Sequence, residues 1–254
     1  MSAQPDLDKL SVEEFAARCR EAMIPVTNKF SYFPASPLSE DDLKEYVEEP
    51  VAALPPALAN ALIPVCIALV PYLERTNGKD KSSQASDAVS FERPPDNRQA
   101  AAGKTIVGDE ATLLFAIKDR PVADYHYWFY HSVAELAADR GNEASQNQFY
   151  SLLREELRSR VHGEVDQEGW HLKEALMRRQ ANLRRETKQF REYARQALVD
   201  TLTLYLHGIC CDIDVEPGPR QLPSRNLRKR LELLESLYPP PDGYAVFPEQ
   251  VTQS

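Results

Sequence analysis

The sequence contains no stretch that is long and apolar enough to cross a membrane. Its longest apolar run, at 57–70, is shorter than a bilayer requires and is interrupted by Pro64. A secretory signal would place basic residues before the first apolar cluster, but Asp6, Asp8 and Glu13 stand there instead. We therefore expect a cytoplasmic protein that has no membrane partner.

Cysteine is scarce as well. The chain has four cysteines, Cys19, Cys66, Cys210 and Cys211, and no Cys-x-x-Cys pair. Adjacent cysteines rarely form a disulfide with each other, and the remaining two do not suggest a disulfide framework. We therefore expect free and mostly buried thiols in a reducing compartment.

The common catalytic motifs are absent too. The sequence has neither Gly-x-Ser-x-Gly nor His-Glu-x-x-His. The tripeptide at 103–105 has the ending of a phosphate-binding loop, but Arg98 occupies the position of the required glycine. A di-iron bundle needs two Glu-x-x-His pairs and two further glutamates, whereas Glu168 and His171 form a single pair. The sequence therefore predicts no metal site, names no cofactor and assigns no catalytic residue.

The composition is that of an ordinary globular protein. The chain has 254 residues, of which 43 % are hydrophobic and 27 % are charged. This length is enough for one large domain or two small ones. The net charge of −9 argues against general affinity for nucleic acid, although a local basic face remains compatible with it.

The most regular pattern is a segment at 165–208 that contains no proline and only Gly169 before its closing glycine. Residues of high helix propensity dominate it. Its apolar side chains recur every seven residues, at Leu176, Leu183, Phe190, Ala197 and Leu204. The pattern predicts a long helix, or two helices with a break, that forms the spine of a helical domain.

Most of the remaining chain also favours helices. Ser11-x-x-Glu14 and Ser39-x-x-Asp42 are typical of capping boxes. An apolar helix is expected over 57–74, kinked or split into short pieces by its prolines. A helix is also preferred over 109–117, although the β-branched residues just before it leave a strand as the alternative. We predict an all-α fold, a multi-helix bundle organised around the long helix, with a smaller N-terminal helical subdomain.

Three regions follow from these patterns. They are an acidic N-terminal helical subdomain at 1–75, a flexible linker or long loop at 76–104, and a C-terminal helical domain with a proline-rich tail at 105–254. The linker is rich in small and polar residues, and its only sizeable apolar residues are Val89 and Phe91. It has too little to bury to offset the entropy lost on ordering.

A stretch of eight residues at 124–131 carries aromatic and histidine side chains around the whole circumference of a helix. We interpret it as a central core helix whose polar tips find hydrogen-bond partners. A ligand pocket or a protein interface is the alternative. Because His131 and Glu135 share a helix face, the candidate pocket consists of Tyr127, His131 and Glu135.

The clearest departure from average composition is basic charge. Residues 173–195 carry eight basic side chains against three acidic ones. Arg184, Lys188, Arg191 and Arg195 share one helix face through their spacing. These four side chains either pair with acidic residues of the same chain or bind an acidic partner.

These observations favour an interaction or adaptor protein that docks an acidic protein surface through the basic face. Two other classes stay open. One is an enzyme with an Asp/Glu/His site in the helical bundle, with or without a metal. The other is a nucleic-acid-binding protein, which the acidic net charge disfavours. Assembly into a homo-oligomer is also open.

Overall fold

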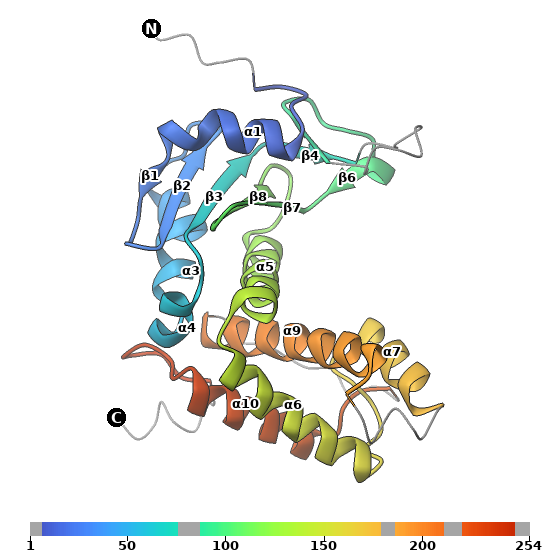
Figure 1. Ribbon diagram of the computed structural model, residues 1–254. Helices are drawn as coiled ribbons and strands as arrows, with labels where there is room; N and C mark the ends of the chain where they lie inside the picture. Colours follow the sequence, from blue (N-terminus) through green and yellow to red (C-terminus); the bar gives the residue numbers. More distant parts are fainter. Residues whose placement is uncertain (1–6, 76–86, 179–185, 211–219, 247–254) are drawn as a thin grey trace, which may run out of the picture. The chain divides into compact units, whose positions relative to one another are not determined.

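The computed structural model describes residues 7–75, 87–178, 186–210 and 220–246 (Figure 1). The protein is mixed α/β, with 54 % of its residues in helices and 17 % in strands. The prediction of an all-α fold is therefore wrong. No helix in the described ranges has the length and apolarity that a bilayer span requires.

The chain divides into two compact units. The first, here called the α/β unit, comprises Met1–Ala52 and Leu62–Ser132. The second, the helical unit, comprises Ala53–Ala61 and Val133–Ser254.

The α/β unit is built on a five-stranded sheet of order β1-β2-β3-β8-β7. Its strands are β1 (Ile24–Pro25), β2 (Phe30–Pro34), β3 (Val65–Val70), β8 (Glu110–Ala116) and β7 (Ala102–Val107). The three central strands β2, β3 and β8 run parallel, and both edge strands are antiparallel to their neighbours. Ile67 of β3 is paired with Tyr32 of β2 on one side and with Leu113 of β8 on the other.

The two central strands correct two helix predictions. Over 109–117 the alternative, a strand, is the one that forms, and over 57–74 only the first residues are helical, in α4 (Pro56–Ala61). All six residues of β3 are buried, and so are the last six of β8. A parallel strand that is covered on both faces has a continuous apolar run, which periodicity cannot separate from a buried helix. Pro64 and Pro71 flank β3 and do not kink a helix.

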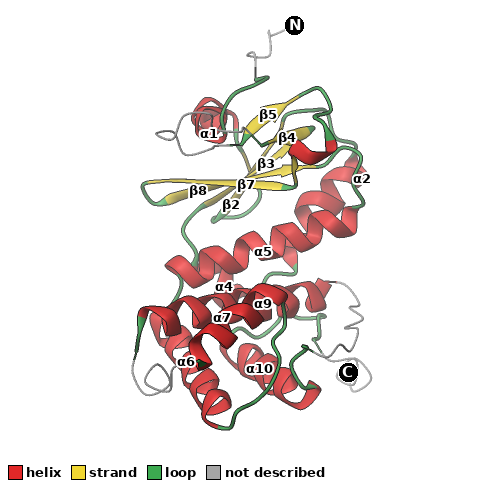
Figure 2. Ribbon diagram, turned by 90° about the vertical axis from the view of Figure 1, so that its right-hand side faces the viewer, coloured by secondary structure: helices red, strands yellow, loops and turns green. Residues whose placement is uncertain are grey.

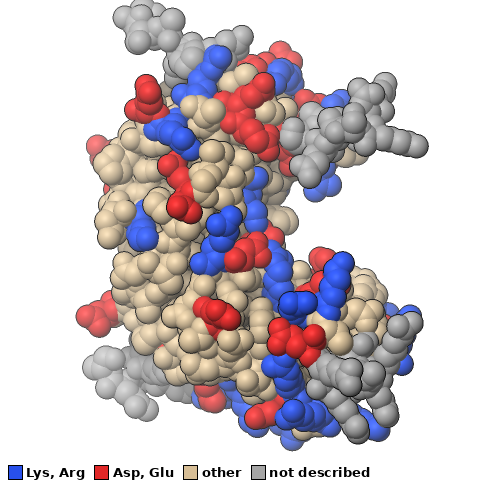
Figure 3. All heavy atoms as spheres, in the orientation of Figure 1, with Lys and Arg blue, Asp and Glu red and all other residues tan. Residues whose placement is uncertain are grey.

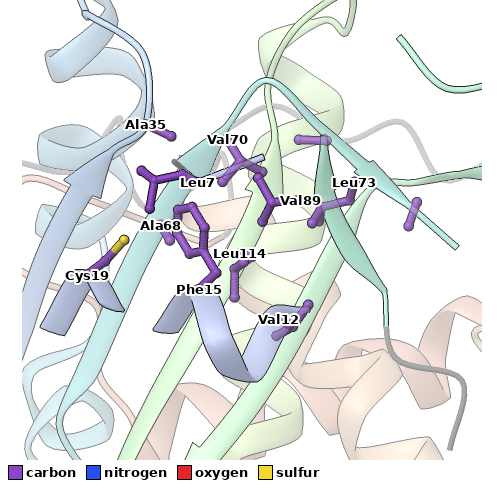
Figure 4. Packing of buried hydrophobic residues seen from close by; sticks show 12 residues of the cluster. Leu7, Val12, Phe15, Cys19, Ala35, Ala68, Val70, Leu73, Val89 and Leu114 are labelled. Carbon is purple, nitrogen blue, oxygen red and sulfur yellow. The ribbon is translucent and has the colours of Figure 1, made fainter. Parts of the chain in front are cut away.

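The sheet is covered on both faces (Figure 2). On one face, Leu114 and Ala116 of β8 join a core with Phe15 and Cys19 of α1 (Val12–Cys19), which Figure 4 shows in close view. On the other face, the Phe115 ring lies 5.2 Å from that of Tyr125, in the first half of α5 (Val122–Arg140). Successive side chains of β8 thus point to opposite faces of the sheet and belong to two different cores.

A second, three-stranded antiparallel sheet adjoins α1. Its order is β5-β4-β6, with β5 (Ala88–Ser90), β4 (Tyr72–Glu74) and β6 (Gln99–Ala100). Val89 is fully buried in the same core as Phe15. Of the predicted linker at 76–104, residues 76–86 lie outside the described residues, and the remainder contains β5, η3 (Asp96–Arg98), β6 and the start of β7.

Short helical segments complete the α/β unit. They are η1 (Arg20–Ala22), α2 (Glu40–Leu43), the π-helical turn η2 (Lys44–Glu48) and α3 (Glu49–Ala52). The predicted capping boxes at Ser11 with Glu14 and at Ser39 with Asp42 are confirmed, since each serine accepts from the backbone N–H three residues on.

The helical unit contains α4 (Pro56–Ala61), the second half of α5, α6 (Glu143–Arg158), α7 (Gln167–Met177), α9 (Lys188–Cys210) and α10 (Ser224–Leu237). The segment predicted at 165–208 contains α7 and α9, and residues 179–185 between them lie outside the described residues. Phe149 and Leu153 of α6 and Phe190 and Tyr193 of α9 are fully buried.

Candidate functional site

A cavity of about 400 Å³ lies in the α/β unit where its three parallel strands end. Its walls come from the residues that follow β2, β3 and β8, together with α2, η2 and the residue after β5. The lining residues are Ser36, Pro37, Leu38, Asp42, Tyr46, Pro71, Phe91, Ile117 and Lys118. In open α/β sheets, ligands bind in the crevice outside the carboxyl ends of the strands, which makes this cavity the first candidate for a binding site.

Backbone hydrogen bonds extend the parallel ladder beyond the strands and hold these loops in place. The Ala35 N–H donates to the Leu69 carbonyl at 2.8 Å, and the Lys118 N–H donates to the Pro71 carbonyl at 3.2 Å. The chain segments that follow β2, β3 and β8 are thereby aligned along one edge of the cavity. This edge is consequently a continuation of the sheet.

The loop after β8 is anchored by Asp119, which has a positive φ of 59°. The Tyr72 hydroxyl donates to its carboxylate at 2.7 Å, and Arg93 lies 3.9 Å away. Aspartate tolerates the left-handed conformation better than most residues do. The hydrogen bond to the Asp119 carboxylate raises the pKa of the Tyr72 phenol.

Lys118 provides the cationic group of the cavity. Its Nζ lies 5.7 Å from the centre of the Tyr72 ring, within the range of a cation–π contact. Among the described residues, Lys118 has no carboxylate partner. The Asp42 carboxylate, in contrast, already accepts from the Ser39 N–H at 3.0 Å. Lys118 is thus the charge that is available to a ligand.

The walls of the cavity are mainly apolar. Phe91 is 38 % exposed, an unusual position for a phenylalanine, and its backbone is held by a 3.0 Å hydrogen bond from its N–H to Asp8. Tyr46 is buried on the opposite helical segment, and burial raises the pKa of its phenol. Apolar walls with a few convergent polar groups are typical of small-molecule sites.

The predicted basic face is only partly described. Arg184 lies outside the described residues. The Lys188 side chain is 87 % exposed and lies 3.6 Å from Glu192, one turn along the same helix. Arg191 is also exposed, and it forms no ion pair with another described residue. Of the three described members of this face, Lys188 and Arg191 are therefore the accessible ones.

The fourth member, Arg195, is held by carboxylates of the helical unit. Its Nε and Nη2 donate to the two carboxylate oxygens of Asp139 at 2.6 and 2.9 Å, and Glu135 lies 3.6 Å away. The sequence predicts a candidate pocket of Tyr127, His131 and Glu135. The Tyr127 and His131 rings stack with their centres 5.9 Å apart, whereas the Glu135 carboxylate lies beside Arg195.

The histidines for which contacts are known have separate neighbours. His126 bonds the Glu45 carbonyl at 2.9 Å, His162 packs on Trp170, and His171 lies 3.4 Å from Gln167. Over the described part of the chain, no group of three or more His, Cys, Asp or Glu side chains could hold a metal ion. The hypothesis of an Asp/Glu/His enzyme site stays a prediction.

The motifs and spacings of the sequence do not point to the cavity residues as a site. Ile117 and Lys118 directly follow β8, and Pro71 directly follows β3. If 65–70 and 110–116 are read as parallel strands, the residues that follow them are expected to meet at one edge of the sheet and to form a site there.

Comparison with family models, with curated proteins and with solved structures finds no match to this chain.

Proposed function

We propose that the α/β unit binds a small molecule that has an anionic group and an apolar ring, in the cavity at the carboxyl ends of β2, β3 and β8. The observation that carries the proposal is the position of Lys118, at the end of a parallel strand and without a carboxylate partner among the described residues. Phe91, Tyr46 and Ile117 supply the apolar surface for the ring.

The proposal is a binding function, and it assigns no reaction. The polar groups of the cavity are an ammonium, a carboxylate that is engaged in a helix cap, and the hydroxyls of Ser36 and Tyr46. A nucleophile and a base within hydrogen-bond reach of each other would be needed to argue for acyl transfer. The cavity instead supports recognition of charge and shape.

A panel of aromatic carboxylates and aryl phosphates tests the proposal by titration calorimetry with the full chain. At least one member should bind, and Lys118→Gln should weaken that binding by about tenfold or more, since it removes the charge but keeps most of the stem. Phe91→Ala should weaken it separately. Lys188→Gln, an exposed lysine of the helical unit, is the control and should leave affinity unchanged.

A second proposal concerns the helical unit. Docking of an acidic partner protein through the basic face now rests on Lys188 and Arg191, because Arg195 is bound to Asp139. The double variant Lys188→Gln/Arg191→Gln should lose partners that the wild-type protein retains in a pull-down from its native cell. Their retention should fall with added salt if the contact is electrostatic. Identical partner lists for the two proteins would rule this docking out.

A further inference from the structure

The helical unit has a buried ionic cluster at its centre. Arg230 is fully buried and binds Glu156 at 2.6 Å and Glu164 at 2.8 Å. Lys173 donates to Glu164 at 3.0 Å, and the Tyr193 hydroxyl donates to the same oxygen at 2.6 Å. Two cations thus balance two carboxylates, and every member of the cluster has a partner.

A cavity of about 310 Å³ lies beside this cluster. The last turns of α6 and the residue Val161 form one side, and the first turns of α10 form the other. Glu156 lines the cavity and also holds Arg230. The buried ion pair thereby ties α6 to α10 and fixes the two walls relative to each other.

Three charged side chains line the cavity and form no ion pair with one another. They are Glu155 on α6, and Arg225 and Lys229 one turn apart on α10. None of the three forms an ion pair with another described residue. Figure 3 shows basic side chains, with acidic ones among them, over α6 and α10 at the lower edge of the face drawn. Side chains of opposite charge therefore line the same cavity and form no ion pair across it.

We propose that this cavity binds a free α-amino acid or a closely related zwitterion. The carboxylate would lie between Arg225 and Lys229, close to the positive end of the α10 dipole. The ammonium would face Glu155. A simple anion would meet Glu155, and a simple cation would meet Arg225 and Lys229.

The size and the apolar surface of the cavity agree with such a ligand. Its volume lies at the lower end of the range for small-molecule sites, about 300–1,000 Å³. Leu152 and Val161 provide apolar surface for the ligand's side chain. The proposal does not depend on the α/β-unit cavity, because every residue it uses belongs to the helical unit.

Titration calorimetry with the full chain and the common free α-amino acids tests the proposal. At least one should bind saturably at millimolar concentration or below. Its N-acetyl derivative lacks the ammonium, its amide lacks the carboxylate, and each should bind at least about tenfold more weakly. Glu155→Gln should weaken the amino acid but not inorganic phosphate, whereas Lys229→Gln should weaken both.

Arg228→Gln is the matched control, because Arg228 lies on α10 but does not line the cavity, and it should leave binding unchanged. Melting temperatures of all variants should stay near that of the wild type, since the substituted side chains are exposed. Absence of saturable binding for every amino acid would overturn the proposal. Equal affinity for the N-acetyl derivative, or for phosphate, would overturn it as well.

Discussion

Arg230 and Glu156 form a buried, multiply hydrogen-bonded pair in the helical unit. Arg230 Nη2 lies 2.6 Å from Glu156 Oε2, and Arg230 Nε lies 3.2 and 3.1 Å from the two carboxylate oxygens. Their side chains are 0 % and 3 % exposed. Such a pair is expensive to break, because the remaining charge stays buried without its partner.

Arg230→Met should therefore destabilise the protein strongly. It leaves Glu156 without its cation and removes one of the two cations of Glu164, and the expected loss is about 3–5 kcal/mol of unfolding free energy. Urea denaturation measures it. Arg228→Met, on the exposed side of the same helix, should change stability by no more than about 1 kcal/mol. Equal stability of both variants would contradict this account of the cluster.

Asp200 should make stability fall as pH rises. Its carboxyl is buried, accepts from Gln196 at 2.8 Å through one oxygen, and has no partner among the described residues for the other. Burial raises its pKa to about 7, with smaller contributions from Asp166 and Glu164. Since the unfolded pKa is about 3.9, the folded state binds more protons between these values.

The stabilisation linked to Asp200 is thus fully present below about pH 4 and lost as pH rises through about 7. Asp200→Asn stays neutral and keeps an acceptor for Gln196. The variant should gain stability relative to the wild type at about pH 8, by at most on the order of 4 kcal/mol, and should gain little at about pH 4. A difference between the two proteins that does not change with pH would exclude the raised pKa.

Gly163→Ala should destabilise the protein for two reasons. The backbone at this position has a positive φ, and there is no room for a Cβ. Gly163 has a φ of 84°, and an added Cβ would lie 2.0 Å from the Gln221 carbonyl oxygen. Gly243 has a similar φ of 87° but open space around it. Gly243→Ala should therefore cost about 1–2 kcal/mol from the backbone alone, and Gly163→Ala clearly more. Equal melting temperatures for the two variants would show that the segment at 220–222 moves aside.

The cysteines should differ in their rate of alkylation. Burial raises the pKa of the Cys19 thiol to about 11, and it also raises that of Cys66, which donates to Glu110 at 3.2 Å. Cys210 is less buried than either. Because the thiolate is the reactive form, iodoacetamide at about pH 8 should modify Cys210 before Cys19 and Cys66. Peptide mass spectrometry of timed samples measures the order.

Local features of the chain could be predicted from its sequence. The capping box at Ser11 depends on a serine and on Glu14 three residues later, and both hydrogen bonds form as expected. Asn142 caps α6 through an equally local contact, by accepting from the N–H groups of Ala144 and Ser145. These interactions need no distant partner, so a short stretch of sequence is sufficient to specify them.

The sheet depended on contacts that local patterns do not contain. The residues of β3 and β8 are apolar throughout, and their strand conformation follows from pairing with each other over a long sequence separation. Propensity arguments favoured helix over 109–117, and tertiary pairing outweighed them. The cavity at the strand ends could not be located without that sheet, and Lys118 was therefore not recognised as a site residue.

The sequence by itself determined the helix caps at Ser11 and Ser39, the helices within 165–208 and the charges available to each segment. Only the tertiary structure decided how those charges are used. Arg195 pairs with Asp139, and Arg230 with Glu156 at a separation of 74 residues, whereas Arg225 and Lys229 line a cavity without an ion pair to a described residue. Helix caps arise from side chains within one turn, but charge pairing depends on which surfaces the folded chain brings together.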